Sequence, residues 1–134
     1  MNALLDSSAI IEFLRGNLEV LRLIEEADTV STSVLCVYEV LAGEFYRERR
    51  RRRSLLREVM ELLAELNPIP LVNDDSVKAS EICSALMIKG QMVNATDILI
   101  SAQALRRGLT VVTKDKDFGL IKKSEPELKL HLLT

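Results

Sequence analysis

The sequence contains a single histidine, His131, and no tryptophan. Because a paired-histidine acid–base mechanism and a histidine-rich zinc site each need more than one imidazole, the composition argues against both. A Ser-His-Asp triad would depend on His131 alone, and no Gly-x-Ser-x-Gly turn accompanies it. Aromatic residues make up only 4% of the chain, which is too few for the stacking platforms on which many single-strand-binding proteins hold bases.

Cysteine is also scarce, and long apolar runs are absent. Cys36 and Cys83 lie far apart without a Cys-x-x-Cys motif, which excludes a zinc knuckle, and their apolar helical surroundings predict buried thiols. No basic segment followed by an apolar one opens the chain, and no apolar stretch approaches the roughly 20 residues of a membrane span. We therefore expect a soluble, cytoplasmic protein.

The formal net charge of −2 conceals a strong asymmetry. Residues 47–57 contain seven arginines and one acid, so this segment alone carries +6 and the rest of the chain carries −8. Four of the arginines, Arg50, Arg51, Arg52 and Arg53, are consecutive. Such a block is typical either of a solvated helix end or of a surface that contacts phosphates or an acidic partner.

Short apolar or β-branched runs alternate with helical patterns along the 134 residues. We predict strands at residues 3–5, 29–32, 69–72, 109–112 and 128–132. We predict helices over about 8–15, 18–27, 34–49 and 73–89, another that ends at residue 66, and a last one that begins at Asn94 or Thr96 and ends at about residue 107. A serine is expected to cap the first of them. This alternation favours an α/β fold with a mainly parallel sheet covered on both faces, organised as a single domain over residues 1–134.

Two acidic residues follow predicted strands. Asp6 comes directly after the apolar run Ala3-Leu4-Leu5, and Asp115 comes shortly after Val111-Val112. Each alone is equally typical of an ordinary turn or cap residue. Ligands of open parallel sheets bind beyond the carboxyl ends of the strands, so together the two acids indicate one crevice at that edge.

Two further acids lie in helical patterns. Glu39 sits within an apolar stripe, where an unpaired carboxylate is costly unless it reaches solvent, meets a cation or is protonated. Asp97 begins a helix with no other charge before Arg106, although acids also favour a first helical turn through the helix dipole. Four carboxylates from four segments would repel one another, and they suit a hard divalent cation such as Mg²⁺ or Mn²⁺.

These four acidic segments resemble, in order and spacing, the four motifs of PIN-domain ribonucleases, and within that family the toxins of VapBC toxin–antitoxin pairs. The resemblance covers essentially the whole chain. It is carried by the segments Leu4-Leu5-Asp6-Ser7-Ser8-Ala9-Ile10-Ile11, Val37-Tyr38-Glu39-Val40-Leu41 with Gly43, Asp97-Ile98-Leu99-Ile100-Ser101-Ala102 with Gly108, and Val111-Val112-Thr113-Lys114-Asp115-Lys116-Asp117-Phe118.

The resemblance implies a Rossmann-like α/β/α sandwich and metal-assisted hydrolysis of RNA phosphodiester bonds by an endoribonuclease. The residues it implies as ligands of Mg²⁺ or Mn²⁺ are Asp6, Glu39, Asp97 and Asp115. Thr113, Ser7 and Ser8 would support them through their hydroxyls. Asp117 is the alternative fourth acid, although it is more consistent with a cap on the turn at Phe118-Gly119. A tRNA or ribosomal RNA substrate, a VapB-like antitoxin and a homodimer are also implied.

The basic residues have two interpretations each. The block from Arg50 to Arg53 would support binding of RNA or antitoxin, or would simply be solvated. Lys114, next to Asp115, would contact a phosphate or face solvent.

Other functions fit the sequence less well. A receiver-like phosphoacceptor needs adjacent acids early in the chain, and a haloacid-dehalogenase-type phosphatase needs a second Asp where Ser8 stands. The full set of acids argues against a non-catalytic binding module. A non-toxin PIN nuclease of RNA processing stays an alternative.

Overall fold

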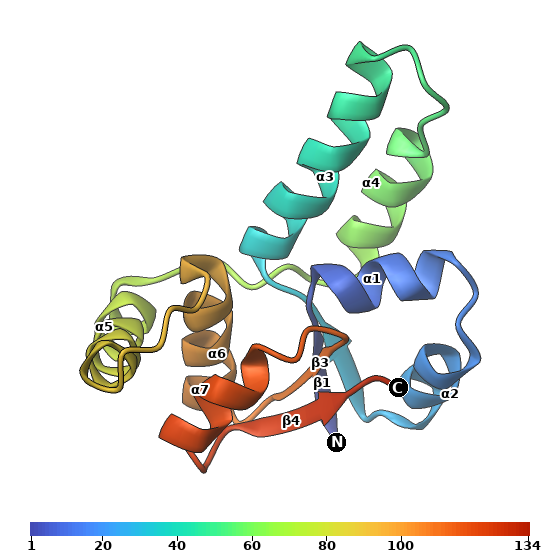
Figure 1. The fold of residues 1–134 in the computed structure, drawn as a ribbon. Helices are drawn as coiled ribbons and strands as arrows, with labels where there is room; N and C mark the ends of the chain where they lie inside the picture. The colour runs from blue at the N-terminus through green and yellow to red at the C-terminus, as the bar shows by residue number, and fades with distance from the viewer.

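The computed structural model describes residues 1–134 and contains four strands and seven helices (Figure 1). The strands are β1 (Asn2–Leu5), β2 (Thr29–Ser31), β3 (Thr110–Thr113) and β4 (Lys129–Leu132). The helices are α1 (Ser7–Leu14), α2 (Leu18–Glu26), α3 (Val34–Arg49), α4 (Leu56–Glu65), α5 (Asn73–Ile88), α6 (Ala95–Arg107) and α7 (Phe118–Ser124).

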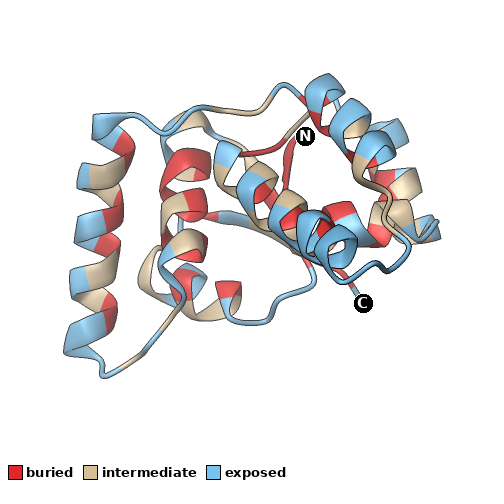
Figure 2. Cartoon of the chain, turned by 90° about the horizontal axis from the view of Figure 1, so that it is seen from above, coloured by how far each residue is buried: buried red, intermediate tan, exposed pale blue.

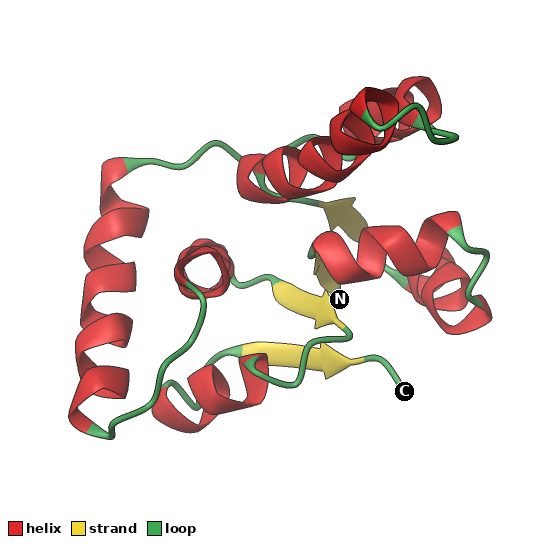
Figure 3. Cartoon of the chain, turned by 45° about the horizontal axis from the view of Figure 1, so that its top comes forward, coloured by secondary structure: helices red, strands yellow, loops and turns green.

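The four strands form one parallel sheet in the order β2-β1-β3-β4. In the central pair, Leu5 of β1 lies opposite Val112 of β3, and the Asp6 N–H donates to the Val112 carbonyl at 3.1 Å. Helices lie on both sides of the strands (Figure 3), which confirms the predicted α/β/α sandwich. The register brings the carboxyl ends of β1 and β3 side by side at one edge.

The core is built from aliphatic residues, as a chain poor in aromatics requires. The strands β1 and β3 are buried from Ala3 to Leu5 and from Val111 to Thr113. Figure 2 shows buried residues gathered on the inner sides of the helices, with exposed residues on their outer sides. Cys36 belongs to this core, and burial raises the pKa of its thiol to about 11. Cys83 is only half-buried, so the prediction of a buried thiol was wrong for that residue.

Helices α3 and α4 form a hairpin that projects from the sheet (Figure 1). Ser33 caps α3 by accepting from the Leu35 N–H at 3.1 Å. Residues 50–55 connect the two helices, so the consecutive arginines occupy the far end of the hairpin, where all four are exposed. Arg51 turns the chain there with a φ of 52°.

Helix α5 packs on α6, which separates it from the sheet (Figure 3). A fully buried carboxylate, Asp75, joins the two helices. Its Oδ1 accepts from Arg106 Nη1 at 2.6 Å and from Arg107 Nη1 at 2.8 Å, and its Oδ2 accepts from the Val72 N–H at 3.0 Å. Asp75 therefore stabilises both the start of α5 and its contact with α6.

Three local predictions were wrong. Residues 69–72 form no strand: only Ile69 makes an isolated parallel bridge, to Ser33. The turn expected at Phe118-Gly119 is the helix α7. The first helix is capped by Asp6 rather than by a serine, because the Asp6 side chain accepts from the Ala9 N–H. None of the helices has the length and apolar character that a membrane span requires.

Candidate functional site

Asp6 stands where β1 ends, at the edge that the sheet register creates. Its Oδ1 accepts from Ser8 Oγ at 2.7 Å and from the Ala9 N–H at 2.9 Å, and its Oδ2 accepts a short hydrogen bond from Thr113 Oγ1. Burial raises the pKa of Asp6, and these three hydrogen bonds oppose that rise. The carboxyl is therefore fixed in orientation while it remains poorly solvated.

Thr113 connects Asp6 to Asp115. Its Oγ1 accepts from the Asp115 N–H at 2.9 Å, so one hydroxyl orients the first acid and holds the backbone of the other. The Asp115 side chain accepts from the Asp117 N–H at 2.9 Å. Asp117 lies just before α7 but makes no side-chain cap, so the predicted capping role of Asp117 was wrong.

Glu39 approaches this edge from α3. Its Oε1 accepts from Ser7 Oγ at 2.7 Å and its Oε2 from Thr96 Oγ1 at 3.4 Å, which links α3 to α1 and α6. The side chain is half-buried, so the apolar stripe does not enclose it. Thr96 was missed as a site residue, and its only sequence signal is its place beside Asp97.

Asp97 is the most unusual acid of the group. Its residue is only 9% exposed, and no side chain or backbone group donates a hydrogen bond to its carboxyl. Burial, together with repulsion from Asp115, Asp6, Glu39 and Asp117, raises its pKa to about 7. The other three predicted acids therefore all act on Asp97 at this edge, although the four come from four segments of the chain.

The oxygen atoms of the four acids can be compared with the ligands that a divalent cation prefers. No three His, Cys, Asp or Glu side chains form a preassembled metal site in this arrangement. The chemistry of the group nevertheless fits, because its side chains offer only oxygen donors and its like charges raise the pKa of Asp97. A cation placed among these carboxylates would offset that repulsion. The residues therefore suit a hard divalent cation better than zinc.

Comparison with known proteins decides the family. The family model described as "PIN domain" matches residues 3–124. The chain belongs to the PIN domain family. It is 28% identical over 120 residues to Ribonuclease VapC5 of Mycobacterium tuberculosis, covering 87% of this chain and 85% of that protein.

Two solved structures share this PIN-domain fold. One is VapBC2 from Rickettsia felis bound to a promoter DNA fragment, with a TM-score of 0.79, 19% identity and full coverage of both chains. The other is VapBC-5 from Mycobacterium tuberculosis, a member of a toxin–antitoxin family. It has a TM-score of 0.72 and 23% identity, and the match covers 99% of this chain and 100% of that one.

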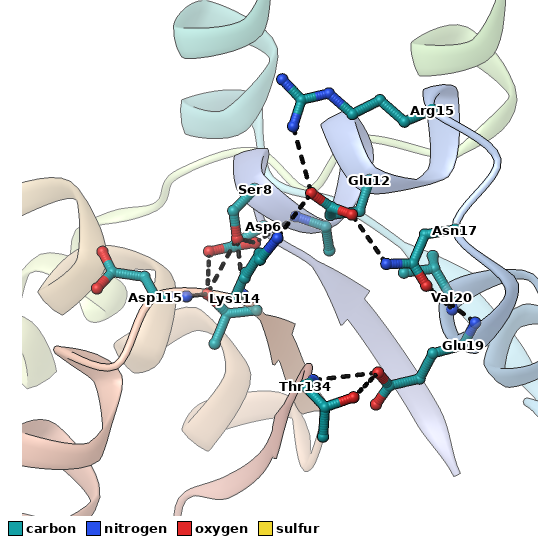
Figure 4. Close-up of polar contacts among 12 residues, drawn as sticks. Asp6, Ser8, Glu12, Arg15, Asn17, Glu19, Val20, Lys114, Asp115 and Thr134 are labelled. Atoms are coloured by element: carbon teal, nitrogen blue, oxygen red, sulfur yellow. Dashed lines mark hydrogen bonds and ion pairs between the residues drawn. The ribbon is translucent and has the colours of Figure 1, made fainter.

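A second network in this PIN domain surrounds Glu12, a buried acid of α1 that sequence reasoning missed. Figure 4 shows Arg15, Asn17 and Lys114 converging on it: Asn17 Nδ2 donates at 2.8 Å, Lys114 Nζ at 3.2 Å and Arg15 Nη1 at 3.4 Å. The hydrogen bonds from Asn17 and Lys114 lower the pKa of Glu12. Its sequence signal is a lone charge within the apolar pattern of the first helix.

The Glu12 network also defines the place of Lys114. The Lys114 N–H donates to Ser8 Oγ at 2.9 Å while the ammonium reaches Glu12, so this lysine is held beside the acidic edge at both ends.

The only histidine is engaged elsewhere, because His131 Nε2 lies 3.2 Å from Glu19 Oε2 of α2. No histidine therefore takes part in the acidic site.

A cavity of about 210 Å³ opens between α1 and α3 beside the acids. Its lining includes Glu39 at one end, Arg47 further along α3, and Arg15 from the end of α1. Gly43 lies one helical turn after Glu39 and also lines the cavity. A Cβ atom built at Gly43 would meet nothing within 4 Å, so close packing does not require glycine there.

Gly43→Ala should therefore stabilise the protein. Glycine within a helix destabilises it by roughly 0.5–1 kcal/mol relative to alanine, and no neighbour would clash with the added methyl group. Urea unfolding should show a gain of about that size. Gly16→Ala is the matched contrast, because Gly16 has a φ of +80° and its replacement should destabilise the chain. Equal effects of the two changes would contradict this reading of Gly43.

Proposed function

We propose that this chain is a metal-dependent endoribonuclease that hydrolyses RNA phosphodiester bonds with Mg²⁺ or Mn²⁺. We further propose that it acts as the toxin of a VapBC-type toxin–antitoxin pair. The observation that carries the proposal is Asp97, a buried carboxyl without a hydrogen-bond donor that lies near four other acids in a PIN domain. A bound cation would stabilise the charged form of a carboxyl in that setting.

In this proposal Asp6, Glu39, Asp97 and Asp115 hold the ion, and hydroxyl groups orient two of these acids. Ser8 and Thr113 fix Asp6, and Ser7 fixes Glu39. When bound there, a divalent ion supplies charge to the phosphate oxygens and lowers the pKa of a water molecule. No imidazole base is needed for such chemistry, which is consistent with the scarcity of histidine.

The fourth acid of the proposed site is Asp115 rather than Asp117. Asp115 is the strongest of the like charges that raise the pKa of Asp97, and Asp117 is the weakest of those named. Asp115 also shares Thr113 with Asp6 through its backbone N–H. Asp115→Asn should therefore reduce cleavage far more than Asp117→Asn does.

The relatives of this chain support two of the proposed partners. Ribonuclease VapC5 and the toxin–antitoxin family of VapBC-5 support an RNA substrate and a VapB-like antitoxin for this chain. A tRNA or ribosomal RNA target and a homodimer stay predictions. A non-toxin PIN nuclease would cut RNA equally well, so growth arrest on expression, relieved by a small protein encoded beside the gene, separates the toxin from that alternative.

Cleavage by the purified protein tests the enzyme itself. Total RNA incubated with Mg²⁺ or Mn²⁺ should be cut, EDTA should stop cleavage, and Asp6→Asn should abolish it. Asp28→Asn is a matched control, because Asp28 contacts only the chain's amino terminus at 2.7 Å. Cleavage that persists in EDTA or in the Asp6 variant would overturn the proposal, and RNA binding without any cleavage would favour a binding module.

Thr113→Val should weaken this activity about tenfold at neutral pH, the effect of losing one hydrogen bond to a charged group. The Thr113 hydroxyl lowers the pKa of Asp6, so its removal should move the acidic limb of the pH–rate profile to higher pH. Thr113→Ser keeps the hydroxyl and should keep the profile in place. An unshifted profile for the valine variant would exclude this role.

A further inference from the structure

The cavity between α1 and α3 has features of a binding site for an anionic chain. Arg15 and Arg47 stand on its two walls, from different helices, and Glu39 of the proposed metal site forms part of its lining. Glu39 therefore belongs both to the cavity lining and to the group of four acids. Any strand whose reacting phosphate lies at the acids has this cavity next to it.

The two guanidinium groups keep most of their donors free. Arg15 reaches Glu12 at 3.4 Å and Arg47 reaches Glu44 at 3.6 Å, and their side chains are 68% and 55% exposed. Both carboxylates have shorter bonds to other donors, since Glu12 accepts from Asn17 at 2.8 Å and Glu44 accepts from the Leu55 N–H at 2.8 Å. A guanidinium carries five N–H donors, so each arginine can bind a phosphate without breaking the local structure.

Gly43 supplies an independent observation. It lies between Glu39 and Arg47 on α3, in the middle of a helix, where glycine is unfavourable and no neighbouring atom requires it. The missing side chain keeps the cavity open along α3 from the acidic edge toward Arg47. Two helical turns separate Glu39 from Arg47, a rise of about 12 Å, and the arginine block lies beyond them at the end of the hairpin.

We propose that this cavity is a subsite for the RNA backbone, in which Arg15 and Arg47 bind phosphates that flank the scissile bond. The inference rests on the proposed ribonuclease function. The acidic body of the chain would repel a polyanion, so cations beside the acids are needed to hold the strand. An RNA strand is favoured over an acidic protein segment because the cavity adjoins the carboxylates proposed to act on a phosphate.

Binding measured without metal tests the subsite separately from catalysis. A labelled single-stranded RNA of mixed sequence is titrated with the protein in EDTA over a range of salt concentrations. Arg15→Gln and Arg47→Gln should each weaken binding roughly tenfold at about 50 mM salt and reduce the slope of log affinity against log salt by about 0.7. Arg22→Gln is the matched control, because Arg22 lines a different cavity with Met1 and Glu26.

Gly43→Leu provides a second variant that does not alter charge. Leucine favours a helix and has room for its Cβ atom, so the protein should stay folded while the side chain fills the cavity. RNA binding should weaken although both arginines remain. In Mg²⁺, all three variants should raise KM for RNA and leave kcat nearly unchanged.

Three results would overturn the subsite. The first is that wild type does not bind the RNA, and the second is that the two arginine variants match Arg22→Gln in affinity and salt slope. The third is that these variants lose binding of a polyglutamate peptide but keep binding of RNA, which would assign the cavity to an acidic protein segment. Binding through both arginines without cleavage in Mg²⁺ would instead contradict the proposed function and leave the subsite standing.

Discussion

Asp97→Asn should abolish RNA cleavage and at the same time stabilise the metal-free protein. The loss of cleavage should be on the order of a thousandfold, because the change removes a central ligand of the proposed ion. The gain in stability should be on the order of 2 kcal/mol, because the amide removes a buried carboxyl that like charges surround. Activity assays and urea unfolding in EDTA measure the two effects.

The pH dependence of folding stability shows whether the Asp97 carboxyl stabilises or destabilises the metal-free protein. The pKa of Asp97 is about 7 in the folded protein and close to 3.8 in the unfolded chain. Between these values the unfolded chain has released the proton that the folded protein keeps, so stability falls as pH rises from about 4 to 7. Asp97→Asn should show a smaller fall in stability over this pH range. Asp74→Asn, at the exposed start of α5, should show the same fall as wild type. A variant that is less stable than wild type in EDTA would contradict this account.

Asp75→Ala should destabilise the protein by about 3–5 kcal/mol, the usual effect of removing one partner from a buried ion pair. The change leaves Arg106 and Arg107 without their shared carboxylate and the Val72 N–H without its acceptor. Urea or thermal unfolding measures the loss. Asp74→Ala is the matched control, because Asp74 is exposed and reaches Arg106 only at 3.5 Å, so its loss should change stability by less than about 0.5 kcal/mol.

Lowering the pH should destabilise the wild-type protein by part of the amount that Asp75→Ala does. Burial by itself would raise the pKa of Asp75, but hydrogen bonds from Arg107, the Val72 N–H and Arg106 lower it to about 2, below the ordinary value of 3.8. The ion pair therefore contributes its full stability above about pH 4 and loses it as pH falls toward 2. This contribution is about 2 kcal/mol and should be missing from the Asp75→Ala variant. Identical acid unfolding curves for the two proteins would contradict it.

The acidic edge could be predicted from the sequence because two of its acids come just after strands. Asp6 and Asp115 each follow an apolar run, and parallel pairing of β1 with β3 brings such positions together. Glu39 and Asp97 were predicted from charge in otherwise apolar helical patterns. The hydroxyls of Ser7, Ser8 and Thr113 were expected to support the acids, and each makes a hydrogen bond with one of them.

The failed predictions have local physical causes. Ile69 stands between Pro68 and Pro70, which lack the N–H groups that a strand ladder needs, and Leu71 and Val72 are exposed, so residues 69–72 make one bridge only. Asp6 caps α1 because its carboxyl, rather than a serine hydroxyl, meets the Ala9 N–H.

Some contacts could not be predicted because they depend on tertiary structure. Glu12 meets Lys114 across 102 residues, and no periodic pattern encodes that pairing. The cavity that joins Arg15 to Arg47 depends in the same way on how α1 packs against α3. Neither a helical pattern nor a strand pattern specifies where two separate elements will meet.

The most direct test of the proposed metal site is a crystal of the protein grown with Mn²⁺ and measured at a wavelength where manganese scatters anomalously. If the proposed metal site exists, an anomalous peak should lie among the carboxylate oxygens of Asp6, Glu39, Asp97 and Asp115, and crystals of Asp97→Asn should show no such peak. A manganese ion bound elsewhere, with these four carboxylates free of metal at saturating Mn²⁺, would contradict it.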